Sequence, residues 1–241
     1  MKKIITLFGL MLCMFATAQE NATGEYMYIF HSDKRIERVE VAKIDSVTFV
    51  NPLQAVDLGL SVKWATFNVG ATKPEEYGGY YAWGETEEKE IYDWSTYKWC
   101  NGSYDTMTKY CANNSYGIVD NKTVLDLEDD VAHVKWGGDW RMPTKAEQDE
   151  LRNNCTWEWT ALNDVNGYKV TGPNGNSIFL PAAGYRRGSD VSYRGDSGFN
   201  WSGSLGSSFS VDAYGLDFYD GYYGWGDYSR FCGRSVRPVS E

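Results

Sequence analysis

The stretch that decides the fold is WGGDWRMPTKAEQDEL, residues 136–151. It contains the end of one segment with a helical pattern and the start of another. Thr144 and Glu147 stand three residues apart, and this spacing is typical of a capping box, in which each side chain bonds the other residue's backbone N–H. The polar run KAEQDELRNN follows directly. The sequence therefore predicts a helix over residues 145–154.

The other helical pattern lies just before this stretch, in LEDDVAHVK, residues 127–135. Asp126 precedes it at the position of an N-cap, and the acidic residues 128–130 suit the positive end of the helix dipole. Gly137 and Gly138 follow the pattern, and glycine ends many helices because it adopts a left-handed backbone without cost. We expect two helices in this part of the chain.

Strand patterns flank the helices on both sides. Apolar residues alternate with polar ones or glycine throughout 56–64, which predicts a single strand. Residues 168–171 and 177–180 are predicted to pair as a hairpin through the turn 173–175. After Pro181 the chain is rich in Gly, Ser, Tyr and Asp, and no further helix is expected.

The chain begins with MKKIITLFGLMLCMFATAQE, in which two lysines precede an apolar run and the small residues Ala16-Thr17-Ala18. This pattern predicts a secretory signal peptide over residues 1–18. The apolar run is too short to span a bilayer, and no later run reaches the about 20 apolar residues that a membrane helix needs. A lipid anchor at Cys13 is the less favoured alternative, because Leu12 stands where a small residue is expected.

Residues 26–50 carry two or three short strand patterns, with a turn expected at 32–34. Asn51 and Pro52 end this segment. We therefore predict a small β-hairpin module over 19–51 and a main domain over 52–241. An isolated hairpin is only marginally stable, so the module is expected to dock on the main domain or on another chain.

The charge of the chain narrows the class of its partners. It has 33 acidic and 23 basic residues, a net charge of −10. A chain this acidic repels the phosphates of nucleic acids and anionic lipid surfaces. Nucleic acid is therefore not an expected partner.

Four cysteines follow the predicted signal peptide: Cys100, Cys111, Cys155 and Cys232. An even number in an oxidising compartment suggests disulfides. Cys100 and Cys111 are the favoured pair, because they would close a short loop and stabilise the fold by about 3 kcal/mol. The alternative is that these residues are buried free thiols.

Six segments between Val56 and Val239 resemble, in content and order, the Fibrobacter succinogenes major paralogous domain family of exported bacterial proteins: VDLGLSVKWATFNVG, YGGYYAWGE, WGGDWRMPTKAEQDEL, GNSIFLPAAGYR, GFNWSGS and GRSVRPV. That family is similar in fold to C-type lectin-like domains, and through them to formylglycine-generating enzymes and to the target proteins of diversity-generating retroelements. The resemblance implies an α+β fold with two helices, short mixed or antiparallel sheets and long loops. The N-terminal module also resembles one that often precedes such domains.

The sequence offers little for catalysis. The two histidines, His31 and His133, are both interpreted as structural; His133 lies between Val131 and Val134, which are expected to face the core. No H-E-x-x-H, C-x-x-C, G-x-S-x-G or phosphate-loop motif occurs. The resemblance to formylglycine-generating enzymes would require a copper-binding cysteine pair, for which Cys155 and Cys232 are the candidates, but their flanking residues do not match.

Calcium is the one cofactor that the sequence leaves open. The tripeptides through which C-type lectins hold calcium are absent. Asn163, Asp164 and Asn166 offer oxygen ligands in a turn, and so do residues 128–130. Turn formation and helix capping explain both sets with fewer assumptions, so we predict no cofactor.

Residues 214–231 are the most unusual part of the chain, because eight of these eighteen residues are aromatic and most others are Gly, Asp or Ser. Antibody paratopes have this composition, since Tyr and Trp give large contact areas at low entropic cost. Leu216 and Phe218 alternate like buried strand residues, and Arg230 and Arg237 are interpreted as framework. The predicted ligand contacts are Tyr214, Asp217, Tyr219, Asp220, Tyr222, Tyr223, Trp225, Asp227 and Tyr228.

The sequence thus predicts an exported, non-enzymatic recognition module that binds a glycan or a protein surface outside the cell. One version makes the chain a diversified retroelement target, because many residues of 214–232 are reachable from an Asn codon by changing its adenines. Two other classes stay open. They are a formylglycine-generating type of enzyme, and a fimbria-like structural subunit in which the hairpin of 26–50 pairs with a neighbouring sheet. The alternative for the rings themselves is ordinary packing.

Overall fold

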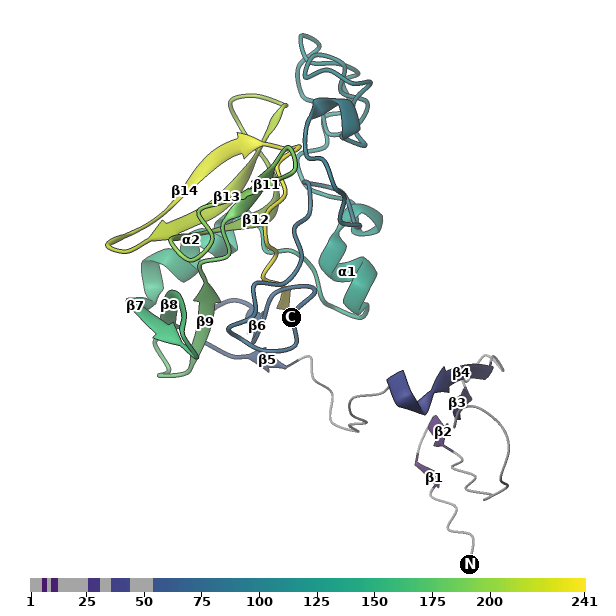
Figure 1. The fold of residues 1–241 in the computed structure, drawn as a ribbon. Helices are drawn as coiled ribbons and strands as arrows, with labels where there is room; N and C mark the ends of the chain where they lie inside the picture. The colour runs from purple at the N-terminus through teal and green to yellow at the C-terminus, as the bar shows by residue number, and fades with distance from the viewer. Residues whose placement is uncertain (1–5, 8–9, 13–25, 31–35, 44–53) are drawn as a thin grey trace, which may run out of the picture. The chain divides into compact units, whose positions relative to one another are not determined.

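A computed structural model describes residues 6–7, 10–12, 26–30, 36–43 and 54–241. The chain divides into two compact units, Met1–Asn51 and Pro52–Glu241, which are described separately here (Figure 1). No helix among the described residues is both long enough and apolar enough to cross a membrane.

The N-terminal unit contains an antiparallel sheet with the order β1-β2-β3-β4. Its strands are β1 (Thr6–Leu7), β2 (Leu10–Leu12), β3 (Tyr26–Phe30) and β4 (Ile36–Glu40), and the 3-10 helix η1 (Val41–Lys43) follows. The predicted hairpin is confirmed by the pairing of β3 with β4. The turn expected at 32–34, His31 and the third strand pattern near Val47 lie outside the described residues.

The first helix of the main unit begins later than predicted. The 3-10 helix η3 (Leu127–Asp129) comes first, and α1 (Val131–Trp136) begins after Asp130. Asp130, rather than Asp126, is the N-cap, because its Oδ1 accepts the N–H groups of Ala132 at 2.9 Å and His133 at 3.2 Å. Gly137 ends the helix with a φ of +68°, as predicted.

The second helix, α2 (Lys145–Asn154), confirms the predicted capping box. The Thr144 N–H donates to Glu147 at 2.7 Å, and the Glu147 N–H donates to the Thr144 hydroxyl at 3.3 Å. Arg141 binds both oxygens of the same carboxylate, at 2.7 and 2.8 Å. The helix start is therefore fixed by local side chains.

The single strand predicted over 56–64 is wrong. The chain forms β5 (Ala55–Val56), turns, and returns as β6 (Lys63–Ala65), which pairs with β5 and with the last strand, β15 (Val239–Ser240). Gly59 has a φ of +76° in this turn, and its N–H donates to Asp57 Oδ1 at 2.7 Å. Leu58, Val62 and Trp64 are nevertheless buried, and Val56 and Leu60 are partly buried against the same core cluster.

The remaining strands form three small sheets within residues 54–241. One contains β7 (Thr156–Leu162), β8 (Val165–Thr171) and β9 (Ser177–Pro181), one contains β10 (Tyr185–Arg187) and β11 (Asp190–Ser192), and one contains β12 (Ser197–Leu205), β13 (Asp212–Tyr219) and β14 (Tyr222–Ser229). All of these pairs are antiparallel, which includes the predicted β8–β9 hairpin. A short 3-10 helix, η2 (Trp94–Thr96), lies in the long segment before α1.

The main unit is therefore α+β, with mostly small antiparallel sheets and two α-helices, as the sequence predicts. No helix follows Pro181 in the described chain. The more specific C-type lectin-like fold stays a prediction.

The β12–β13–β14 sheet has a core cluster on each side. Leu216 and Phe218 belong to a cluster with Leu151 of α2, and α2 packs against all three strands (Figure 1). Trp201 and Ala213 point to the opposite face and belong to the other cluster. The sheet thus carries buried side chains on both faces.

All four cysteines of the main unit are free thiols, so the predicted Cys100–Cys111 disulfide is not formed. The Cys100 thiol contacts the carbonyl of Trp94 at 3.1 Å, and the Cys111 thiol contacts the carbonyl of Asn113 at 3.1 Å. Both residues are buried in the same core cluster, where they pack as small apolar side chains.

Candidate functional site

The aromatic stretch forms the β13–β14 hairpin, and the strand alternation sends its side chains to two faces. Asp217 pairs with Gly224, and Tyr219 pairs with Tyr222, on one face. On the other face, the α2 side, Phe218 pairs with Tyr223 and Leu216 with Trp225. The nine predicted contacts therefore do not form one surface.

The prediction that Tyr214 is an outward contact is wrong. Its side chain is buried, because it shares the α2 side of β13 with Leu216 and Phe218. The Tyr214 hydroxyl lies 2.5 Å from the Ser207 Oγ. Its ring meets Trp225 edge to face, with 5.3 Å between centroids.

Tyr223 and Trp225 are exposed on the α2 side, with about two fifths of each accessible. Each has one ring face covered. Tyr223 stacks on Trp157 of β7 at 4.7 Å with 7° between the ring planes, and the ammonium group of Lys145 lies 4.0 Å from the Trp225 ring centroid. These rings contribute to packing as well as to the surface.

The other face of the sheet is hollowed into a cleft of about 660 Å³ between the β12–β14 sheet and the β10–β11 hairpin. We call it the Arg234 cleft. Its lining residues are Tyr185, Arg187, Tyr193, Ser197, Phe199, Asp212, Asp217, Tyr219, Asp227, Tyr228, Ser229, Phe231, Cys232 and Arg234.

Four of the nine predicted contacts line this cleft: Asp217, Tyr219, Asp227 and Tyr228. Tyr222 lies beside it and stacks on Tyr219, with 4.9 Å between centroids. Asp220 is exposed in the turn of the hairpin. The Asp227 carboxylate hydrogen-bonds with Ser208 and lies near Lys145. Because Asp227 pairs with Tyr214 on the α2 side of the sheet, only part of this residue borders the cleft.

Sequence reasoning missed the opposite wall, which comes from residues 185–199. Tyr185, Tyr193 and Phe199 contact one another there, with ring centroids 5.1 to 6.5 Å apart. Tyr193 has a φ of +59°, a left-handed conformation that is rare for a bulky residue. The Tyr, Arg, Gly and Ser composition of GYRRGSDVSYRG, residues 184–195, repeats that of the aromatic stretch and could have identified this wall.

Sequence reasoning also missed Arg234, which forms the floor of the cleft. Only 3% of its surface is accessible. Its guanidinium carbon lies 3.5 Å from the ring centroid of Tyr228, 4.6 Å from that of Trp201 and 5.0 Å from that of Phe199. Nε and Nη1 are buried without a hydrogen-bond partner among the described residues.

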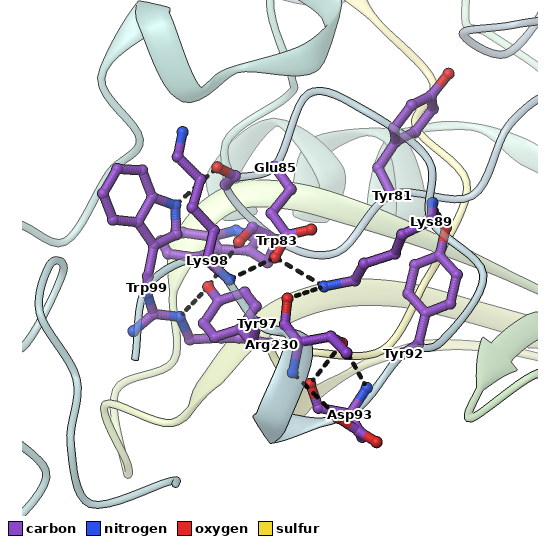
Figure 2. Close-up of polar contacts among 12 residues, drawn as sticks. Tyr81, Trp83, Glu85, Lys89, Tyr92, Asp93, Tyr97, Lys98, Trp99 and Arg230 are labelled. Atoms are coloured by element: carbon purple, nitrogen blue, oxygen red, sulfur yellow. Dashed lines mark hydrogen bonds and ion pairs between the residues drawn. The ribbon is translucent and has the colours of Figure 1, made fainter. Parts of the chain in front are cut away.

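Two other buried arginines, Arg230 and Arg237, have hydrogen-bond partners for all their guanidinium nitrogens. Arg230 donates from Nε to the Tyr97 hydroxyl at 2.8 Å, as Figure 2 shows. Its remaining nitrogens donate to the backbone carbonyls of Lys109, Tyr110 and Ser210 at 2.8 to 3.1 Å. Its environment leaves nothing for a ligand to bind.

Arg237 is saturated in the same way. Its Nε donates to Asn68 at 2.8 Å, and its other nitrogens donate to the carbonyls of Ala65, Thr66 and Phe179 at 2.8 to 3.1 Å. Arg230 and Arg237 therefore connect distant loops, and both match the framework role that the sequence predicts for them.

Asp217 also has an unmatched group in the cleft. Its Oδ1 is buried and has no hydrogen-bond partner within the described chain. Burial, together with the Asp217 charge, raises the pKa of the Tyr228 hydroxyl, while burial raises the pKa of Asp212 and lowers that of Arg234. The cleft thus holds charged side chains that are only partly paired: Asp217 Oδ1 and Arg234 Nε and Nη1 have no hydrogen-bond partner among the described residues.

The acidic residues 128–130, considered for calcium, are already engaged, because Asp130 caps α1 and Lys109 binds Glu128 and Asp129. The carboxylates of Asp126, Glu128 and Asp129 lie close together, but the ammonium group of Lys109 contacts all three, at 2.7, 3.3 and 2.6 Å. In the β7–β8 turn, Asn163 and Asp164 have φ values of +48° and +65°. Both central residues of a type I′ turn adopt such values, so turn formation explains these two residues.

The structure does not bring the two candidate copper-binding cysteines together. Cys155 and Cys232 pack against different core clusters, and burial raises the pKa of Cys155 to about 11 and also raises that of Cys232. His133 contacts the Trp140 carbonyl at 3.3 Å. Val134 beside it is exposed rather than core-facing, which corrects the expectation from the sequence.

Comparisons of the chain with family models, with curated proteins and with solved structures found no match.

Proposed function

We propose that the main unit is a non-enzymatic recognition module that binds its ligand in the Arg234 cleft. The chain is expected to be exported, so the ligand is a glycan or a protein surface outside the cell. The resemblance to the Fibrobacter succinogenes major paralogous domain family implies a fold for this module more than a function, and membership in that family is part of the proposal.

The observation that carries the proposal is the pair of unpartnered nitrogens on Arg234. A buried polar group without a hydrogen bond costs about 1–3 kcal/mol, and a charged group costs more. Most buried polar groups in proteins are therefore paired. Arg230 and Arg237 follow this rule through four hydrogen bonds each. A ligand that accepts hydrogen bonds would satisfy Arg234 in the same way.

The walls of the cleft support this role. Tyr185, Phe199 and Tyr228 are held by contacts with one another or with Arg234. Rings fixed in this way lose little entropy when a ligand binds. The volume of about 660 Å³ lies within the roughly 300–1,000 Å³ that is usual for small-molecule sites.

The chemistry of the lining residues favours binding over nucleophilic catalysis. Its serines have no histidine beside them in the set that lines the cleft, and the raised pKa of Cys232 keeps its thiol protonated. A nucleophile needs an adjacent base or a lowered pKa. Hydrogen bonding and ring contacts are what these groups can supply.

A binding screen with two matched variants tests the proposal. The mature chain is screened against glycans and bacterial surface proteins, and any partner is then titrated against Tyr219→Ser, in the cleft, and Tyr223→Ser, on the α2 side. Both tyrosines are partly exposed, at 48% and 39%. We expect a loss of affinity of about tenfold or more for the first variant, in line with the about 1–2 kcal/mol that an aromatic contact residue contributes, and less than twofold for the second.

Equal retention by both variants, or a loss only in Tyr223→Ser, would move the site away from the Arg234 cleft. Turnover of the bound partner by the wild-type chain would make the protein an enzyme. Circular dichroism and thermal unfolding of both variants show that each is folded.

A further inference from the structure

We infer that the Arg234 cleft takes a neutral sugar with adjacent free hydroxyls, bound by direct contacts without a metal ion. This inference rests on the proposed function, because it names the ligand class of the same cleft. Its starting point is the presence, in one cleft, of unmatched donors on Arg234 and an unmatched acceptor on Asp217.

The two unmatched groups belong to the same side of β13. Nη1 of Arg234 packs over Gly215, 3.3 Å from the position that a Cβ there would take. Asp217 lies two residues along the strand and therefore on the same face. The Tyr228 hydroxyl interacts with both side chains, but Arg234 Nε and Nη1 and Asp217 Oδ1 have no partner within the described chain. A ligand between them must accept from one and donate to the other.

A hydroxyl group does both, and two adjacent hydroxyls do both at once. The planar guanidinium group carries N–H donors on each of its edges, and Nε and Nη1, which lie on different edges, can each donate to one oxygen. The hydroxyl protons can then be donated to a carboxylate. A diol of a sugar ring thus matches Arg234 and Asp217 together, which a ligand with acceptors alone does not.

The charge of the cleft favours a neutral ligand. The cleft is lined by two arginines, Arg187 and Arg234, and by three aspartates, Asp212, Asp217 and Asp227, so that one negative charge is in excess. An acidic sugar would gain from Arg234 but would be repelled by the aspartates, since charges in a partly buried site are weakly screened. A divalent cation would in turn be repelled by the buried guanidinium group.

The rest of the lining also fits a sugar better than the zwitterionic end of an amino acid. Six lining residues carry hydroxyl groups: Tyr185, Tyr193, Ser197, Tyr219, Tyr228 and Ser229. They can exchange hydrogen bonds with a polyol along the whole cleft, whereas a zwitterion concentrates its polar groups at one end. The rings of Phe199 and Tyr228 offer flat surfaces for the C–H face of a pyranose.

The test compares neutral oligosaccharides with their acidic counterparts. Oligosaccharides of galactose, glucose and mannose, the corresponding oligomers of galacturonic, glucuronic and mannuronic acid, and a set of dipeptides are arrayed, and hits are titrated by calorimetry. We expect at least one neutral sugar to bind about tenfold or more tightly than its uronic acid counterpart. O-methylation of its hydroxyls should abolish binding, and EDTA should leave it unchanged.

Variants then locate the contacts. Asp217→Asn and Arg234→Lys are each expected to weaken binding of the neutral sugar about tenfold or more, because the amide adds donors where an acceptor is needed and lysine lacks the planar guanidinium group. Tyr223→Ser on the α2 side is the control. Should Arg234→Lys fail to fold, Asp217→Asn, whose side chain is only partly buried, still decides the outcome.

The outcomes separate this inference from the proposed function. Tighter binding of a uronic acid or a dipeptide, or a requirement for calcium, overturns the inference, while loss of that binding in Tyr219→Ser keeps the cleft as the site. Failure of every probe to bind also overturns the inference. Binding of a neutral sugar that survives both Asp217→Asn and Tyr219→Ser overturns the inference and the proposed function together.

Discussion

Arg230 and Arg234 are four residues apart and equally hidden from solvent, yet their surroundings differ. Arg230 lies where the ends of several loops meet, so free backbone carbonyls surround it. Arg234 lies over the face of the β12–β14 sheet, whose carbonyls are already paired within the sheet. The backbone offers Arg234 no acceptors there, and aromatic rings take their place.

The difference teaches that burial alone does not identify a structural arginine. A guanidinium group that binds carbonyls of distant segments stabilises the fold, and removing it leaves those carbonyls unpaired. A guanidinium group that is covered only by rings retains its hydrogen-bonding capacity for another molecule. The sharpest way to break this comparison is to replace both residues by an apolar side chain of similar length.

Arg230→Met should give the largest effect. It leaves three buried carbonyls and the Tyr97 hydroxyl without their donor, and breaking such a set costs about 3–5 kcal/mol. The measurement is the free energy of unfolding from urea titration. A loss below about 1 kcal/mol would contradict the structural role of Arg230.

Tyr97→Phe should give the next largest effect. The Tyr97 hydroxyl accepts from Arg230 Nε at 2.8 Å and donates to the Trp83 carbonyl at 2.7 Å, so its removal leaves two buried groups unmatched and costs about 1–3 kcal/mol. Tyr228→Phe is the matched control, because it keeps the ring against Arg234 and removes a hydroxyl that interacts with side chains rather than with a backbone carbonyl; we expect a cost below about 1 kcal/mol. Equal losses of unfolding free energy in the two variants would contradict the distinction between the surroundings of Arg230 and those of Arg234.

Arg234→Met should change stability by no more than about 1 kcal/mol, since it removes a buried cation that has two unpartnered nitrogens and replaces it with an apolar side chain. The same variant should lose ligand binding. Urea titration and the binding screen are run on one preparation. A cost comparable to that of Arg230→Met would assign Arg234 to the framework.

The smallest expected effect on stability is that of Asp126→Asn. Asp126 binds the ammonium group of Lys109, whose backbone carbonyl accepts a hydrogen bond from Arg230. Hydrogen bonds from Lys109 and then Lys122 lower the pKa of Asp126 to about 2. A carboxyl whose folded-state pKa is depressed stabilises the fold above its unfolded pKa and loses this contribution as the pH falls, here from about 4 toward 2.

Asp126 is about one third exposed, so solvent screening limits the contribution to a few tenths of a kcal/mol. We expect Asp126→Asn to reduce stability by that amount at pH 6 and by only a small part of it at pH 2, where the folded-state carboxyl is half protonated. Urea midpoints at the two pH values provide the measurement. An equal reduction at both would show that the charge of Asp126 is not the cause.

Local patterns in the sequence predicted local structure well. The capping box of Thr144 and Glu147 and the β8–β9 hairpin need only residues that are close in the chain, and both are confirmed. The pattern of 56–64 was wrongly interpreted as one strand, because alternation indicates which residues face the core, and a turn at Gly59 brings Leu58, Val62 and Trp64 into the core as well. Asp126 misled because Asp130 offers the same cap one turn later.

The sequence by itself determined the capped start of α2, the glycine end of α1, the β8–β9 hairpin and the concentration of rings in residues 214–231. Only the tertiary structure decided which rings share a face, because the side chains of a strand alternate and the packing of α2 selects the covered side. It also decided that Arg234, rather than Arg230 or Arg237, faces a cleft. The three arginines stand within eight residues of the chain, and what distinguishes them is whether distant segments bring carbonyls within reach of each guanidinium group.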